Sequence, residues 1–240
     1  MKKRWRVEIC LLRLLQLRFV CRLVFKIRFL YFTKIKRSLR IYEDEREVLA
    51  MDVSTRRVIL GRPNNRILRL IRPLVSIDKI DGNSRIVSIG CRYETDLLYL
   101  CAYGCDPRKV RGMDMISYSS WIDLGNMHHM DYPDNHWDAV VLGWVLAYSN
   151  NPRQAAKEIV RVTRDGGLIA VSVTYQPPER LRQLEKDGNL IGNAGAGGRI
   201  QTVQGFRNLF EPHVRHVYFG HDVSDPTRPG WCLAIFSIKK

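Results

Sequence analysis

The sequence predicts an α/β fold: a doubly wound, mostly parallel sheet with an antiparallel C-terminal strand pair, preceded by a basic helical arm. Three observations support this prediction. Short apolar runs alternate with helical segments over residues 84–175, two apolar segments close the chain, and residues 1–40 carry most of the charge. Strands that alternate with helices at this spacing are typical of βαβ units, which form parallel sheets.

The 240 residues include 39 Lys and Arg against 24 Asp and Glu, so the formal net charge is +15. Residues 1–40 hold 13 basic residues and one acid, Glu8, which leaves only +3 for residues 41–240. An apolar content of 45% is ordinary for a globular chain and excludes global disorder, collagen and multi-span membrane classes. The uneven charge also argues against a nucleic-acid surface that covers the whole domain.

The basic arm contains residues 9–33, which include no Gly or Pro and are therefore expected to form one long helix. Five Arg and Lys residues interrupt its apolar sequence, and each costs about 2.5–3.5 kcal/mol at the centre of a bilayer, so a membrane span is disfavoured. Arg18, Arg22 and Lys26 recur at i, i+4 and i+8 and form a basic stripe on this helix.

Several roles remain open for the arm. The first is contact of residues 9–33 with an anionic membrane surface. The second is packing on its own domain or on a partner subunit, and binding to nucleic acid is the least favoured. A transit peptide is also possible, although Ser38 is the only serine in the arm. The expected location is the cytoplasm, with possible peripheral attachment to the membrane.

The elements of the domain over residues 41–240 follow in order. An acidic segment at 43–45 begins a helix, and Asn64 or Asn65 caps a short helix over 66–71 that Pro73 ends. Apolar runs predict strands at 85–89, 110–114, 138–143 and 168–173, and helical patterns predict helices at 95–103 and 152–162. Asp165-Gly166-Gly167 is expected to form a turn, and Glu158 and Arg161 are expected on the surface of their helix.

After these core motifs over residues 84–175, an insertion at 176–200 contains a short helix at 179–186 and a glycine-rich run at 188–198. The glycine-rich run follows no strand, so we interpret it as a mobile lid over a substrate site. A helix that ends at 206–210 comes next. The closing strands, within 212–238, are expected at 214–221 and 231–238.

Cysteine and histidine spacings give no metal site. The six cysteines contain no C-x-x-C pair, and Cys101 and Cys105 lie near a buried helix end. His128-His129 and His136 match no common zinc pattern. Reduced thiols in a reducing compartment are therefore expected.

Ligands of doubly wound sheets bind beyond the carboxyl ends of the strands. This rule selects residues 90–96, Asp114, residues 125–131 and residues 143–149. The turn after the first strand lacks G-x-G-x-x-G and places two acids, Glu94 and Asp96, at a helix start, where they would repel phosphate. A nicotinamide dinucleotide is therefore disfavoured, whereas a cationic nucleoside without phosphate is compatible.

Several linked motifs carry a resemblance at this point. They are Ile86-Val-Ser-Ile-Gly-Cys91, Val110-Arg-Gly-Met-Asp114, Gly125-Asn-Met-His-His-Met-Asp-Tyr-Pro-Asp-Asn-His-Trp-Asp138, and the segments 140–149 and 158–170. In this order they resemble the class I S-adenosylmethionine-dependent methyltransferases, most of all the type-11 group, over residues 84–175. The resemblance implies a Rossmann-like fold and S-adenosylmethionine as cofactor.

By position, the resemblance implies a cofactor site of Gly90, Cys91, Arg92, Asp114, Asn126, Met127, Trp144 and Val145. Gly90 would permit close approach to the methionine part of the cofactor. Asp114 would accept hydrogen bonds from the ribose hydroxyls. Asn126 and Met127 would face the adenine, and Trp144 and Val145 would line the floor of the pocket.

The chain departs from the family pattern at the glycine loop. Arg92 and Glu94 replace the second and third glycines of G-x-G-x-G, and Asn126 stands where Asp is frequent. An ion pair between Arg92 and Glu94 on the surface is the interpretation we prefer slightly; the other is that Arg92 binds the cofactor's carboxylate. The loss of glycines also leaves room for a domain that no longer binds the cofactor.

The sequence predicts methyl transfer to a small-molecule or lipid- or sugar-linked acceptor. Candidates for a general base are His128, His129, Asp131 and Tyr148. The Asn/Asp-Pro-Pro-Tyr turn of amino-group methyltransferases is missing after the strand at 138–143, which disfavours methylation of nucleic-acid bases. The alternatives are a non-catalytic methyltransferase-like domain that binds a membrane or partner and, more weakly, a nicotinamide oxidoreductase. The sequence indicates neither the acceptor nor the oligomeric state.

Overall fold

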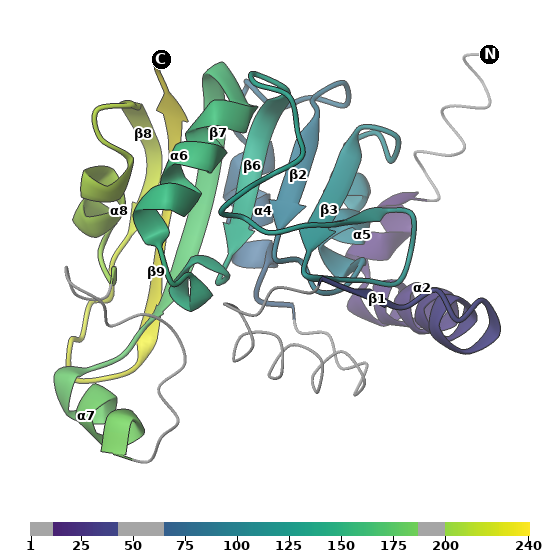
Figure 1. Cartoon of the computed structure of the whole chain (residues 1–240), viewed down its shortest axis with the longest axis horizontal. Helices are drawn as coiled ribbons and strands as arrows, with labels where there is room; N and C mark the ends of the chain where they lie inside the picture. Colours follow the sequence, from purple (N-terminus) through teal and green to yellow (C-terminus); the bar gives the residue numbers. More distant parts are fainter. Residues whose placement is uncertain (1–11, 43–64, 187–199) are drawn as a thin grey trace.

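The computed structural model describes residues 12–42, 65–186 and 200–240 (Figure 1). Its helical elements are η1 (Leu14–Gln16), α2 (Arg18–Leu30), η2 (Tyr31–Ile35), α4 (Leu68–Val75), α5 (Thr95–Ala102), η4 (Leu146–Tyr148), α6 (Pro152–Val162), α7 (Pro178–Lys186) and α8 (Val203–Phe210). Its strands are β1 (Arg40–Ile41), β2 (Ile86–Ile89), β3 (Val110–Asp114), β4 (Ile116–Ser117), β5 (Ile122–Leu124), β6 (Trp137–Gly143), β7 (Thr163–Tyr175), β8 (Val214–His221) and β9 (Gly230–Ile238).

Seven strands form the main sheet in the order β5-β3-β2-β6-β7-β9-β8. The first five are parallel, and β9 pairs antiparallel with both β7 and β8. The predicted mostly parallel sheet with an antiparallel C-terminal pair is therefore confirmed. Central strands such as β2 are buried over their whole length, because helices cover both faces of the sheet.

The helices form two layers around this sheet. One apolar cluster joins α4, α5 and the arm to one face, and a second joins α6 and α8 to the other. Strands β2, β3 and β6 point toward the same edge, with α2 at one end of that edge and α7 at the other (Figure 1). The carboxyl ends of the parallel strands therefore gather between these two helices.

The prediction of one long helix in the arm is wrong. Leu17 has an extended backbone (ψ 113°) between η1 and α2, and α2 continues into a π-helical turn, η2. Leu15 and Cys21 are both buried in the same apolar cluster, although an unbroken helix would direct side chains six residues apart to different sides. The break at Leu17 lets both side chains reach the domain.

The face of α2 that contains Cys21 and Phe25 is fully buried against the domain. Gln16 also donates a hydrogen bond to the Ala102 carbonyl at the end of α5 (3.0 Å). Packing of the arm on its own domain, one of the alternatives from the sequence, is thus what the structure shows for this face. The basic stripe of Arg18, Arg22 and Lys26 is exposed, as predicted.

Other local predictions need correction. Pro73 does not end α4, because a proline close to the C-terminus removes only one hydrogen bond and the helix continues to Val75. Asn65 does not cap α4 through its side chain and instead accepts a hydrogen bond from the Tyr99 hydroxyl (2.9 Å). The expected turn at Asp165-Gly166-Gly167 lies inside the long strand β7.

Some predictions lie outside the described residues: the helix start at 43–45, the glycine-rich lid at 188–198, Asn64 and Cys10. The five described cysteines are buried free thiols, Cys101 and Cys105 among them. In residues 12–42, 65–186 and 200–240, no helix is both long and apolar enough to cross a membrane.

Candidate functional site

The loop between β2 and α5 starts the site with an unusual backbone. Gly90 has a φ of 68°, and a Cβ there would collide with the side chain of Val145. Arg92, at the position of the second family glycine, keeps a φ of 52°, although the left-handed region costs a non-glycine residue about 1–2 kcal/mol. Trp144, after β6, also has a positive φ, 65°. Three left-handed residues therefore meet where β2 and β6 end.

Asp114 ends β3 beside this loop and is only 8% exposed. Its carboxylate accepts one hydrogen bond from the Arg92 backbone N–H (2.8 Å) and one from the Ile116 backbone N–H (3.1 Å). Burial raises the pKa of Asp114 even though these N–H groups and the Arg92 charge oppose the shift. Asp114 thus fixes the left-handed residue of the loop, a task that the sequence did not reveal.

Asp96 is a site residue that the sequence flagged only as an acid at a helix start. It lies in the first turn of α5 and accepts a hydrogen bond from the Ser88 hydroxyl on β2 (3.1 Å). Burial raises the pKa of Asp96 to about 7, with Asp114 adding to the shift and Arg66 and Arg92 opposing it. In the sequence, the one signal that could have identified Asp96 as a site residue was its position two residues after Glu94, which replaces the last glycine of G-x-G-x-G.

Glu94 forms no surface pair with Arg92, so that prediction is wrong. Glu94 is fully buried and binds the Arg28 guanidinium of α2 through two hydrogen bonds, Nε–Oε2 at 2.6 Å and Nη2–Oε1 at 2.8 Å. Its backbone N–H donates to the Tyr118 hydroxyl (2.9 Å). The carboxylate is turned inward because a cation from the distant arm compensates its burial.

Aromatic rings surround this ion pair. Phe25 and Phe29 of α2 contact Tyr93 of the loop, with ring centroids 5.1 and 6.0 Å apart. The Arg28 guanidinium also lies 5.5 Å from the ring centroid of Trp121. The arm and the glycine loop are therefore joined by one charged contact inside an aromatic cluster.

The loop after β5 holds the residues predicted to face an adenine. The side-chain oxygen of Asn126 accepts a hydrogen bond from the His128 backbone N–H (3.0 Å), so a local turn already uses this oxygen. Met127 is half-buried against the second apolar cluster. Asn126 and Met127 follow β5 at the same edge as Gly90 and Asp114.

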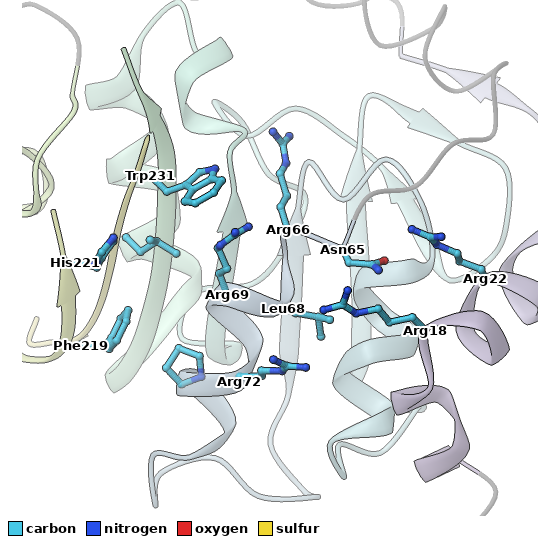
Figure 2. A pocket seen from close by; sticks show the side chains of 12 residues that line it. Arg18, Arg22, Asn65, Arg66, Leu68, Arg69, Arg72, Phe219, His221 and Trp231 are labelled. Atoms are coloured by element: carbon cyan, nitrogen blue, oxygen red, sulfur yellow. The ribbon is translucent and has the colours of Figure 1, made fainter. Parts of the chain in front are cut away.

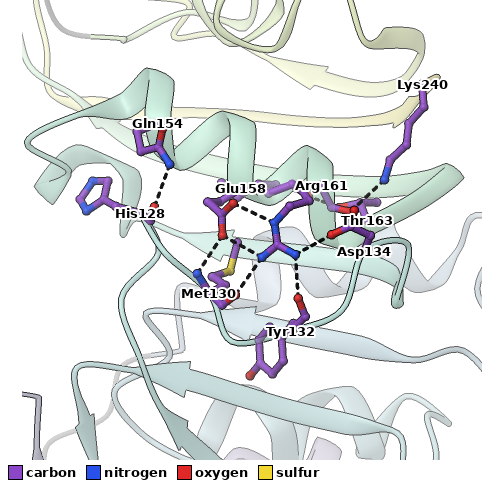
Figure 3. Close-up of polar contacts among 10 residues, drawn as sticks. His128, Met130, Tyr132, Asp134, Gln154, Glu158, Arg161, Thr163 and Lys240 are labelled. Carbon is purple, nitrogen blue, oxygen red and sulfur yellow. Dashed lines mark hydrogen bonds and ion pairs between the residues drawn. The ribbon is translucent and has the colours of Figure 1, made fainter.

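Glu158 and Arg161 hold this loop from α6 (Figure 3). Glu158 accepts a hydrogen bond from the Met130 backbone N–H (2.8 Å), and Arg161 donates to the carbonyls of Met130 and Tyr132, each at 2.8 Å. Arg161 also pairs with Glu158 and Asp134. The prediction that Glu158 lies on the surface is wrong, since it is buried and its hydrogen bond from Arg161 lowers its pKa.

The predicted base candidates occupy different environments. A ring nitrogen of His128 lies 2.7 Å from the Ser149 hydroxyl, and Gln154 donates to the His128 carbonyl (3.0 Å). His129 and Asp131 are exposed, whereas Tyr148 is half-buried in η4. The His128 side chain therefore has a defined polar partner close to the strand ends.

Two side-chain atoms in the site fit a bound ligand. Arg92 Nε and Trp144 Nε1 are buried N–H donors without a hydrogen-bond partner among the described residues. A buried donor left unpaired is costly, so such donors are expected to meet an acceptor when a ligand binds. Cys91 was also predicted in the cofactor site, but its sulfur packs against Gly112 of β3, where it would collide with an added Cβ.

No group of three or more His, Cys, Asp or Glu side chains that could hold a metal ion occurs in the described part of the chain. The arrangement at the strand ends is instead a mixed polar and apolar site. It combines two buried carboxylates, two unpaired donors and an indole ring.

Comparison with protein families matches residues 87–171 to the model of a methyltransferase domain. A curated relative, demethylmenaquinone methyltransferase of Lactiplantibacillus plantarum, is 34% identical over 61 residues. The aligned segment covers 25% of this chain and 26% of the relative's length.

Solved structures share the fold at low sequence identity. The [4+2]-cyclase SpnF has a TM-score of 0.54 and 15% identity, with 84% of this chain and 98% of that chain covered. MccD protein also has a TM-score of 0.54, with 14% identity and coverage of 72% and 96%. Since one of these proteins is a cyclase, the fold alone does not determine the reaction. The family-model match over residues 87–171 and the sheet order together support a methyltransferase-like domain of Rossmann-like fold in this chain.

Proposed function

We propose that this protein is an S-adenosylmethionine-dependent methyltransferase that acts on a small-molecule or lipid- or sugar-linked acceptor. The observation that carries the proposal is the pair of unpaired buried donors, Arg92 Nε and Trp144 Nε1, beside the acid at the tip of β3. A buried donor left unpaired costs about 1–3 kcal/mol, and an acceptor on a ligand bound at the strand ends would remove this cost.

The cofactor would lie across the carboxyl ends of β2, β3 and β5. Arg92 and Trp144 would donate to its carboxylate, and Asp114 would accept from its ribose hydroxyls through the oxygen lone pairs that the backbone leaves free. Asn126 would make a polar contact with the adenine, and Met127 would make an apolar one. The side chain of Val145 lies against Gly90 and would have to rotate to admit the cofactor.

When bound, this cofactor supplies a methyl group on a positively charged sulfonium. The protein then has to bring the acceptor atom in line with that methyl group and exclude water. The buried side chains of Trp144 and Leu146 would help to exclude water from the site. For an oxygen acceptor, His128 would take the proton, and the contact of its ring with the Ser149 hydroxyl supports this role.

Calorimetry with S-adenosylhomocysteine tests the cofactor site. We expect micromolar binding by the wild-type chain and a loss of at least tenfold in Asp114→Asn. Asp123→Asn is the matched control, because Asp123 lies in register with Met113 on the neighbouring strand and accepts a hydrogen bond from the Tyr132 hydroxyl instead. Equal affinity in both variants would exclude Asp114 from the site.

The second candidate function is a non-catalytic domain of the same fold. The contact between Val145 and Gly90 favours it, because this side chain covers the glycine that cofactor binding needs. If Val145 closes the site permanently, the wild-type chain will not bind S-adenosylhomocysteine, and Val145→Ala will gain affinity. Absence of binding in both chains would support the non-catalytic function.

We further propose that the arm attaches the protein to an anionic membrane surface. The outward side of η1 and α2 exposes apolar side chains: Leu14 (49%), Leu17 (48%), Phe19 (69%), Leu23 (57%), Ile27 (60%) and Leu30 (54%). The exposed basic stripe runs beside them along the helix. A helix with this pattern can lie in the interface of a bilayer, its apolar side chains inserted and its cations on lipid phosphates.

Vesicle sedimentation with phosphatidylglycerol and phosphatidylcholine tests this attachment. The triple variant Phe19→Ser, Leu23→Ser, Ile27→Ser should lose binding to vesicles rich in phosphatidylglycerol and keep its fold, because all three side chains are exposed. Tyr218→Ser, which removes an exposed ring from β8, is the control. Unchanged binding of the triple variant would contradict the proposal.

A further inference from the structure

An arginine-rich cavity lies beside the strand ends, between the arm, α4 and the C-terminal strands (Figure 2). Its volume is about 750 Å³, which is within the range of small-molecule sites. Five arginines from three segments line it: Arg18 and Arg22 of α2, Arg66 before α4, and Arg69 and Arg72 of α4. His221, Phe219 and Trp231 form the opposite wall in Figure 2.

The walls of this cavity carry an excess of positive charge. No Asp or Glu belongs to the lining among the residues that the structure describes. Arg72 uses its Nε–H on the Tyr103 hydroxyl (2.9 Å), which leaves its other N–H donors for a ligand. Five guanidinium groups around one hollow favour a ligand with several negative oxygen atoms, and phosphate groups match the geometry of arginine.

The cavity is also connected to the proposed transfer site. Arg66 lines it, and the Arg66 guanidinium lies 4.8 Å from the ring centroid of Trp144. Trp231 is in register with Thr174 near the carboxyl end of β7. A ligand held by the arginines would therefore reach the edge at which Gly90 and Asp114 lie.

An apolar surface adjoins the cavity on its other side. A second hollow of about 690 Å³ shares Arg18 and Arg22 with the first and is otherwise lined by Leu17, Phe19, Leu23, Gln16 and Lys26. Phe19 and Leu23 are more than half exposed. A ligand with phosphate oxygens in the first hollow could thus place a hydrocarbon chain along the second.

From these observations we propose that the cavity binds the phosphate or diphosphate group of a lipid-linked acceptor, with the hydrocarbon chain along the arm. The proposal rests on the proposed function, because it names the acceptor class of that transferase. Nucleic acid fits less well, since the Arg69 guanidinium already lies 3.6 Å from the ring centroid of Trp231 and occupies a face on which a base would stack.

Titration of the full chain with farnesyl diphosphate tests the proposal, with inorganic diphosphate and farnesol as partial probes. We expect farnesyl diphosphate to bind more tightly than either partial probe. The variant Arg69→Gln, Arg72→Gln should lower its affinity at least tenfold. The control Arg153→Gln, Arg207→Gln removes two exposed charges from α6 and α8, on the other face of the sheet, and should change the affinity less than twofold.

Each other outcome overturns a defined part of the proposal. If inorganic diphosphate binds as tightly as farnesyl diphosphate, the hydrocarbon chain is not recognised. If farnesol binds as tightly as farnesyl diphosphate, the phosphate group is not recognised. Tighter binding of a single-stranded oligonucleotide than of farnesyl diphosphate overturns it in favour of nucleic acid. Binding of S-adenosylhomocysteine without binding of farnesyl diphosphate overturns this inference and leaves the proposed function intact.

Discussion

Two arginine–carboxylate junctions hold the two loops of the site, and they differ in origin. The α6 junction, Glu158 with Arg161, joins residues three apart on one helix and fixes the loop after β5. The arm junction, Arg28 with Glu94, joins residues 66 apart and fixes the glycine loop. The first lies within the segment matched by the family model, whereas Arg28 lies outside it.

The difference shows where this chain departs from the pattern of the methyltransferases that it resembles. Glu94 stands where the methyltransferases that this chain resembles have glycine, and its buried carboxylate pairs with Arg28 of the arm, which precedes the segment matched by the family model. The arm is therefore part of the structure that supports the loop between β2 and α5. The arginine cavity also depends on the arm, since α2 contributes two of its five arginines.

Breaking the arm junction should give the largest effect. Arg28→Met leaves Glu94 buried without its cation and should lower the free energy of unfolding by about 3–5 kcal/mol. Urea denaturation measures this change. The double variant Arg28→Met, Glu94→Gln should recover most of the loss, and Lys26→Met, an exposed position on the same helix, should cost little. A loss below about 0.5 kcal/mol for Arg28→Met would show that the pair does not hold the arm.

The second prediction concerns Asp96, which lies two residues beyond Glu94 in the first turn of α5. Because its folded pKa is about 7 and its unfolded pKa about 3.9, the folded state retains a proton that the unfolded state releases between these pH values. Stability should therefore fall as pH rises from about 4 to 7. Asp96→Asn should gain roughly 4 kcal/mol at pH 8 and nothing at pH 3.5. Thermal unfolding of the wild-type chain and of Asp96→Asn measures this difference. If the stability of both chains changed with pH in the same way, the raised pKa of Asp96 would be contradicted.

At the α6 junction, Arg161→Met should cost about 2 kcal/mol, since Glu158 and the carbonyls of Met130 and Tyr132 lose their donor. The pKa of Glu158 is lowered in the fold, so its contribution is present above about pH 4.3 and is lost as the solution becomes more acidic. Hydrogen exchange should accelerate in the loop around Met130. Lys157→Met, exposed on the same helix, is the control.

The smallest expected effect is a gain. Arg92→Gly places glycine at a φ of 52° and should stabilise the fold by up to about 1 kcal/mol, because glycine adopts this conformation without strain. The same change removes an unpaired buried donor, so affinity for S-adenosylhomocysteine should fall. Higher stability together with unchanged affinity would remove Arg92 from the cofactor site.

The sequence alone determined much of the fold. Apolar runs ending at Gly90, Asp114 and Gly143 predicted three strands of a parallel sheet, and rules for such sheets predicted that ligands bind beyond their carboxyl ends. The structure shows that these strands are neighbours. These signals are local, because strand and helix periodicity is written in consecutive residues. The same locality explains why the bounds of α5 and α6 agree with the predicted helices within one residue.

Tertiary structure decided what the charged residues do. Arg28 lies off the basic stripe of the arm, and only the docked arm shows that it points to Glu94. Asp96 acquires a raised pKa from burial, and the arginine cavity exists because α2, α4 and β9 converge. Nothing local encodes these partners, since the cost of burying a charge depends on which distant segment meets it.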